Sequence, residues 1–199
     1  MGDSLHQRPV VRVAIIGHSY VRRLDEYIRQ NQNLRNLKFH QGRVLVRCFG
    51  FGGATLRQGP RCICNQLQHV ADFQADIICI HLGENDITVL SSSKLTEAYV
   101  ELLNIISYQC HDPIVIVGQL LPFPALCHLR QNIVSVNELL TSAIAVSNRR
   151  IFWKHRCGFW NPSCAVFHQD NVHLSQLGMV RYFNSIHAAI RKELHTHVV

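Results

Sequence analysis

Five residues spread along the 199-residue chain have the types that acyl transfer needs. A serine hydroxyl attacks a carbonyl carbon when an imidazole takes its proton and a carboxylate orients that imidazole. Ser19 could be the nucleophile, and Asp170 stands three residues before His173, within reach of its ring. The side-chain amide of Asn85 and the backbone N–H groups of Gly53 and Ser19 could bind the oxyanion. These residues predict a site for nucleophilic attack on a carbonyl.

The segments that must position these residues alternate between strand and helix patterns. β-Branched and apolar runs predict five strands, at 11–16, 44–49, 76–82, 113–119 and 150–153. Apolar residues at helical spacing predict five helices, at 19–31, 60–73, 92–110, 129–147 and 175–194. Such alternation is typical of an α/β domain whose parallel sheet is covered by helices on both faces.

The predicted site residues follow the strands. Ser19 comes after the first strand, Gly53 after the second and Asn85 after the third, while Asp170 and His173 lie in the loop after the fifth. Each could alone be a helix cap or a turn residue. Because open α/β sheets bind ligands beyond the carboxyl ends of their strands, their joint occurrence favours a functional site.

Four segments resemble the sequence blocks of the SGNH hydrolases, also called the GDSL family: "IIGHSYVRRL", "FGFGGATL", "GEND" and "DNVHLS". The resemblance spans about residues 11 to 178 and implies a flavodoxin-like three-layer α/β/α sandwich with a five-stranded parallel sheet. It also implies ester, thioester or amide hydrolysis without a metal or organic cofactor. Ser19, Asp170 and His173 would form the triad, and Ser19, Gly53 and Asn85 the oxyanion hole. Within the family, the first block and "VHLSQLGMVRYFNSIHAAI" are most similar to esterase domains of animal retrotransposon proteins and their stand-alone relatives.

Two residues depart from the family pattern. His18 stands where the first block usually has Asp, and Glu84 stands where Thr is frequent in the third block. A literal "GDSL" occurs at residues 2–5, but no strand precedes Ser4 to deliver it to a sheet. We therefore assign the nucleophile to Ser19 and treat the earlier match as coincidence.

Other site types fit the sequence less well. The α/β-hydrolase fold needs Gly-x-Ser-x-Gly, and Val21 stands where its second glycine would be. Cys62 and Cys64 lie near His69, as Cys157 and Cys164 lie near His168 and His173, yet the paired cysteine spacing of zinc modules is missing. The sequence thus predicts no metal and no cofactor. A catalytically weak or inactive module of the same fold, binding nucleic acid or a protein partner, remains the alternative function.

Composition sets the broad limits. The chain is 47% hydrophobic and has no apolar run long enough to span a membrane. Its length of 199 residues predicts a single domain over 1–199, with loose ends at 1–9 and 195–199. The N-terminus does not have the pattern of a secretory signal, and the eight cysteines are scattered, which favours reduced thiols and an intracellular location, cytoplasmic or nuclear.

Charge and hydropathy bear on partners. The net charge of +7 is compatible with nucleic-acid association, but the basic residues are spread out, which favours an ordinary solvated surface. The expected partner is a small-molecule or lipid ester. The apolar segment "LLPFPAL", residues 120–126, could line an acyl pocket or tuck onto the core.

Overall fold

The computed structural model describes residues 10–156, 158–161 and 165–197. Its sheet has the order β2-β1-β3-β4-β5, and every neighbouring pair is parallel. The strands are β1 (Val11–Gly17), β2 (Val44–Gly50), β3 (Ile77–His81), β4 (Ile114–Gly118) and β5 (Arg150–Trp153). The five predicted strands are confirmed, and their order is the flavodoxin-like one.

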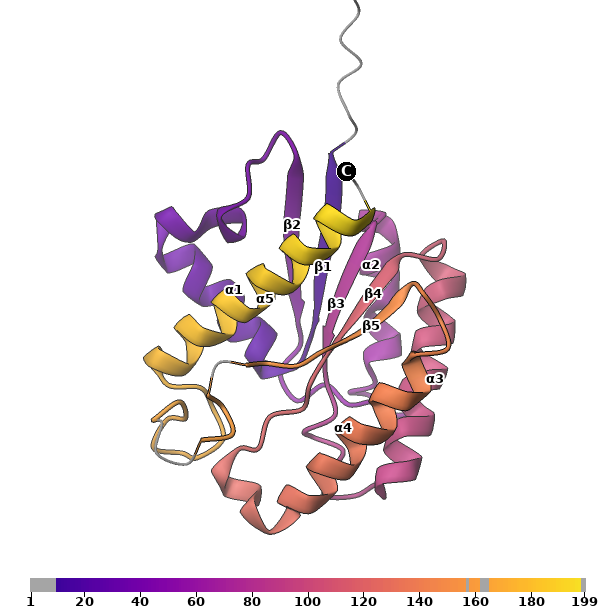
Figure 1. Ribbon diagram of the computed structural model, residues 1–199, viewed down its shortest axis with the longest axis vertical. Helices are drawn as coiled ribbons and strands as arrows, with labels where there is room; N and C mark the ends of the chain where they lie inside the picture. Colours follow the sequence, from indigo (N-terminus) through magenta and orange to yellow (C-terminus); the bar gives the residue numbers. More distant parts are fainter. Residues whose placement is uncertain (1–9, 157, 162–164, 198–199) are drawn as a thin grey trace, which may run out of the picture.

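The helices form a layer on each face of this sheet (Figure 1). One layer holds α1 (Ser19–Gln30) and α5 (Gln176–His197), and the other holds α2 (Leu67–Phe73), α3 (Ser92–Gln109) and α4 (Arg130–Ile144). Because side chains alternate along a strand, β1 divides between two cores. Val13 and Ile15 pack under α1 and α5, while Ala14 and Ile16 pack under the other layer. The predicted three-layer fold is therefore confirmed.

One predicted helix begins later than expected. Instead of starting at residue 60, the chain forms a 3-10 turn at η2 (Ile63–Gln66) and becomes α-helical only at α2. The reason is a loop closed by Thr55, whose N–H donates to Arg61 O at 2.9 Å and whose carbonyl accepts from Ile63 N–H at 2.9 Å. These two backbone bonds form a parallel bridge between Thr55 and Cys62 and hold residues 55–63 in a loop that a helix would break. Two further 3-10 segments were not predicted, η1 (Gln32–Lys38) and η3 (Pro124–Leu129).

The register of the sheet aligns the loops that carry the predicted site. Gly17 at the end of β1 is level with Gly50 on β2 and with His81 on β3. The chain therefore leaves three adjacent strands at the same height, at the lower end of the sheet in Figure 1. None of the helices in the described ranges is both long and apolar enough to cross a membrane.

Candidate active site

Ser19 is the first residue of α1, immediately after the turn that ends β1. A Cβ on Gly17 would collide with the backbone carbonyl oxygen of His81, so the close approach of β1 and β3 at this point requires glycine. His18 caps the helix, since its Nδ1 accepts a hydrogen bond from Tyr20 N–H at 3.3 Å. As the first helical residue, Ser19 has a backbone N–H without an acceptor inside the helix.

His173 and Asp170 form a pair on the loop before α5. His173 Nδ1 donates to Asp170 Oδ2 at 2.8 Å, and the N–H groups of His173 and Val172 both donate to Asp170 Oδ1 at 2.9 Å. These bonds hold the pKa of Asp170 well below its ordinary value, and the bond from the His173 backbone N–H has the largest effect. An ionised Asp170 keeps the ring proton on Nδ1, which leaves Nε2 of neutral His173 as an acceptor.

A hydrogen bond ties this loop to the helix that carries Ser19. The Tyr20 hydroxyl donates to Val172 O at 2.8 Å, from the residue after Ser19 to the residue before His173. Burial, followed by the charges of Glu84 and Asp170, raises the pKa of Tyr20 well above its ordinary value, so the phenol keeps its proton. Among the residues described, Ser19 Oγ bonds to His18 Nδ1 at 3.5 Å and not to His173. Contacts between nucleophile and base commonly tighten only when substrate binds.

Gly53 and Asn85 lie on loops that are bonded to each other. Asn85 Nδ2 donates to Ala54 O at 2.9 Å, which uses one of its two N–H bonds. Gly53 has a φ of 73°, a conformation that favours glycine, and its own N–H meets no acceptor among the residues that the structure describes. One N–H of each residue therefore has no acceptor within the described part of the chain.

Asp86 fixes the loop after β2, which carries Gly53. Its buried carboxylate accepts from Leu56 N–H at 2.9 Å, from Arg57 N–H at 3.3 Å and from Arg57 Nε at 3.1 Å. The loop after β2 is thus anchored to the loop after β3 at both Asn85 and Asp86. Sequence reasoning did not assign a role to Asp86.

Glu84 is the centre of a buried hydrogen-bond cluster that the sequence analysis missed. It accepts from His18 Nε2 at 2.9 Å, from His81 Nε2 at 2.8 Å and from Leu121 N–H at 3.0 Å. Burial alone would raise the pKa of Glu84, but the charges and hydrogen bonds of His81 and His18 hold it well below its ordinary value. The sequence did offer a sign of this cluster. The two residues that differ from the SGNH sequence blocks, His18 and Glu84, are an imidazole and a carboxylate, which can bind each other.

The side chains of His18, His81 and Glu84 are also the one group among the described residues that could hold a cation, since their ligand atoms lie within 4.8 Å of one another. Both Nε2 atoms already meet Glu84 at hydrogen-bond distance, and Leu121 N–H occupies the same carboxylate. The hydrogen bonds account for the cluster. The six described cysteines are free thiols, and Cys157 and Cys164 lie outside the described residues, as does Ser4.

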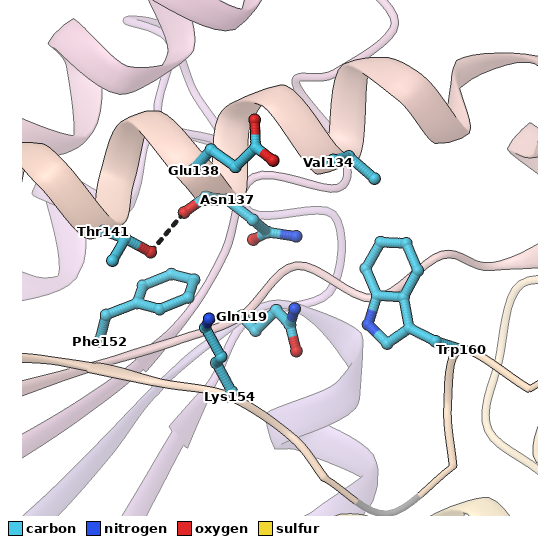
Figure 2. A pocket seen from close by; sticks show the side chains of 8 residues that line it. All are labelled: Gln119, Val134, Asn137, Glu138, Thr141, Phe152, Lys154 and Trp160. Carbon is cyan, nitrogen blue, oxygen red and sulfur yellow. Dashed lines mark hydrogen bonds between the residues drawn. The ribbon is translucent and has the colours of Figure 1, made fainter.

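Two hollows flank this region. A pocket of about 240 Å³ lies between α4 and the segments after β4 and β5 (Figure 2). It includes none of the predicted site residues; its lining is Gln119, Val134, Asn137, Glu138, Thr141, Phe152, Lys154 and Trp160. A groove of about 490 Å³ runs along β2 between α1 and α2 and reaches Gly50 and Phe51, beside the Gly53 loop. Leu120 and Leu121 of the apolar segment are fully buried in the cores, so they do not line an acyl pocket.

No family model and no curated protein sequence matches the chain, but solved structures do. A candidate acylhydrolase from Bacteroides fragilis superposes with a TM-score of 0.72 at 19% identity, over 94% of this chain and 92% of the other. A GDSL-like lipase from Bacteroides thetaiotaomicron gives 0.62 at 18% identity, over 94% and 92%. A carbohydrate esterase family 3 protein from Talaromyces cellulolyticus gives 0.68 at 17%, over 94% and 99%.

The class of structure follows from these matches and from the strand order. The chain has the α/β fold that these acylhydrolases, lipases and esterases share. It covers nearly the whole length of each of them, so the likeness concerns the complete fold and not one of its parts.

Proposed function

We propose that the protein is a serine esterase that hydrolyses carboxylic esters, with acyl or acetyl groups as substrates. The observation that carries the proposal is the 2.8 Å bond from His173 Nδ1 to an ionised Asp170, on a loop bonded to the helix of Ser19. Three of the structures with the same fold are named as an acylhydrolase, a lipase and a carbohydrate esterase, which agrees with this chemistry.

The reaction has two halves. Ser19 Oγ attacks the carbonyl carbon while His173 Nε2 takes the hydroxyl proton, and Asp170 stabilises the resulting imidazolium. His173 then returns the proton to the leaving alcohol, which gives an acyl-enzyme on Ser19. Water repeats the attack with His173 as base and releases the acid.

The negative charge on the carbonyl oxygen needs donors fixed in advance. The free N–H of Asn85, the N–H of Gly53 and the N–H of Ser19 are the proposed oxyanion hole. Preorganised donors of this kind each lower the barrier by about 3–4 kcal/mol. Because Asn85 donates to Ala54 O, the residue after Gly53, these two donors are held side by side before substrate arrives.

The substrate enters as a small-molecule or lipid ester. The groove along β2 ends beside the Gly53 loop and is lined by Phe49, Phe51 and Phe73, so it is the proposed place for one arm of the ester. Arg47 lies over the Phe73 ring, with its guanidinium 4.8 Å from the ring centroid. The groove therefore offers both apolar and positively charged surface.

The alternative of a binding module for nucleic acid gains nothing from the charge arrangement. Several of the basic residues have acidic partners: Arg22 lies 2.6 Å from Glu26, and Arg149 lies 3.2 Å from Asp112. The comparisons with solved structures do not support nucleic-acid association either. The resemblance to retrotransposon esterase domains and the intracellular location stay predictions from the sequence.

Labelling with a fluorophosphonate probe tests the proposal directly. The wild-type protein should be labelled, and Ser19→Ala should not be labelled, because the probe reacts with an activated serine hydroxyl. The matched control is Ser93→Ala, which removes an exposed serine near the start of α3 and should leave labelling unchanged. Failure of folded wild-type protein to react at full probe excess would refute the esterase proposal. Salt-dependent RNA binding that survives Ser19→Ala would instead support the binding module.

A further inference from the structure

His18 presents an unprotonated ring nitrogen to Ser19. Its Nδ1 accepts from Tyr20 N–H at 3.3 Å, and an atom that accepts from a backbone N–H carries no proton of its own. The ring proton is then on Nε2, which donates to Glu84 Oε2 at 2.9 Å. Ser19 Oγ lies 3.5 Å from the same Nδ1, so the serine hydroxyl has a proton acceptor beside it.

The surroundings of His18 can stabilise a positive charge on its ring. Glu84 is ionised and nearly fully buried, and a charge-assisted hydrogen bond strengthens when the donor ring becomes an imidazolium. The other polar or titratable groups facing His18 are His81 and Tyr20. The His81 ring also binds Glu84 and lies edge-on to His18 with 5.5 Å between ring centroids, and the Tyr20 ring centroid is 4.7 Å from that of His18. Protonation of Nδ1 would break the bond from Tyr20 N–H, and the stronger bond to Glu84 compensates for it.

The pair His18–Glu84 is an imidazole bonded to a carboxylate, as is the pair His173–Asp170. The two pairs differ in which ring nitrogen binds the carboxylate. Asp170 binds Nδ1 of His173 and leaves Nε2 free, whereas Glu84 binds Nε2 of His18 and leaves Nδ1 toward Ser19. His173 is partly exposed, with 25% of its side chain accessible, whereas the side chain of His18 is only 3% exposed. Two imidazole–carboxylate pairs thus converge on one helix start.

We propose that His18 is a second catalytic acceptor for the Ser19 proton and that Glu84 is its positioning residue. The inference rests on the proposed esterase function. In the step concerned, the Ser19 O–H bond breaks and its proton goes to His18 Nδ1. The oxygen electron pair forms the bond to the carbonyl carbon, and the carbonyl π pair moves to its oxygen. His18 then supports attack by Ser19 even without His173.

The test measures the rate of fluorophosphonate labelling in a His173→Ala background. Fluoride is the leaving group and needs no general acid, so the two histidines are expected to affect the rate through proton removal from Ser19. We expect His173→Ala to label roughly 10²–10⁴-fold more slowly than wild type but still measurably. Adding His18→Asn should slow labelling at least about tenfold further, although Asn keeps the helix cap. His18→Gln, which can still donate to Glu84, should have the same effect.

His40→Asn is the matched control. His40 Nδ1 also accepts a backbone N–H two residues ahead, from Gly42 at 3.2 Å, but it is exposed and belongs to another part of the fold. In the His173→Ala background it should leave the labelling rate unchanged. The rate should also rise with pH in His173→Ala and lose that dependence when His18→Asn is added, which a merely structural role would not cause.

The outcomes separate the two proposals. If wild type is not labelled at Ser19, the esterase function itself fails. If wild type is labelled but His173→Ala and His173→Ala/His18→Asn react equally fast, with matching thermal unfolding, the role of His18 is refuted. Should His18→Asn not fold, Glu84→Gln in the His173→Ala background replaces it: slower labelling supports the proposal, and an unchanged rate overturns it.

Discussion

At the scale of single residues, two of the candidate side chains have one hydrogen-bonding position engaged and another without a partner among the described residues. His173 uses Nδ1 for Asp170 and keeps Nε2, and Asn85 uses one N–H for Ala54 O and keeps the other. The existing hydrogen bond orients the planar ring or amide group. It thereby sets the direction in which the remaining nitrogen or N–H points. Half-satisfied side chains of this kind are suited to take part in a reaction.

This arrangement gives a prediction for Asn85. Asn85→Ala removes both the oxyanion donor and the bond to Ala54, so kcat for a nitrophenyl ester should fall about 10²–10³-fold. Asn65→Ala is the control, because Asn65 Nδ2 also donates to a loop carbonyl, Gly59 O, at 3.0 Å but is exposed. Near-wild-type turnover in Asn85→Ala would remove this residue from the oxyanion hole.

At the scale of elements, the site depends on how closely β1 approaches its neighbours. Gly17 faces the His81 carbonyl, and a Cβ on Gly50 would collide with the backbone of Arg22 on α1. Phe51 N–H also donates to Gly17 O at 2.8 Å, which continues the ladder past the end of the strands. The glycines therefore let one helix start and two loops converge on one point.

Gly17→Ala tests this close approach. The added methyl group would force the backbone of β1 away from β3, which we expect to destabilise the protein by about 1–3 kcal/mol. For a chain of this length that lowers Tm by roughly 2–12 °C in a thermal unfolding scan. Gly52→Ala should change Tm little, because its Cβ would meet only Arg22 Nε, at 3.7 Å. Equal Tm values for the two variants would contradict this account.

The elements also show what the sequence could and could not predict. Local patterns suffice for the strands, because buried parallel strands are continuous apolar runs such as "IICIH" in β3. They fail at residues 60–66, where the backbone of Thr55 competes for hydrogen bonds that a helix would need. The pairing of Asp170 with His173 follows from a three-residue spacing. The pairing of His18 with Glu84 spans 66 residues and exists only in the folded chain.

At the scale of the whole molecule, Glu84 couples stability to pH. Its pKa is lower in the folded protein than in the unfolded chain, so the folded state is favoured above the ordinary Glu value of about 4.3. That contribution is lost progressively as the pH falls below this value toward the folded pKa. Glu84 thus adds to the acid sensitivity of the fold.

Glu84→Gln should make this coupling visible. The variant keeps the shape of the side chain but lacks the charge, so at pH 7 it should unfold with about 1–3 kcal/mol less free energy than wild type. The difference should shrink as the pH falls from about 4 toward 3, as measured by urea unfolding across pH 3–8. A constant difference over the whole range would show that the charge of Glu84 is not responsible.

The Glu84 carboxylate also has a consequence for how the chain folds. Its partners come from the ends of three neighbouring strands, namely His18 after β1, His81 on β3 and Leu121 after β4. A partly assembled sheet that lacks any one of these strands would enclose a carboxylate with an unmet bond, which is costly in an apolar interior. Half-formed states are thereby penalised, and the three strands are expected to assemble in one cooperative transition without a populated intermediate.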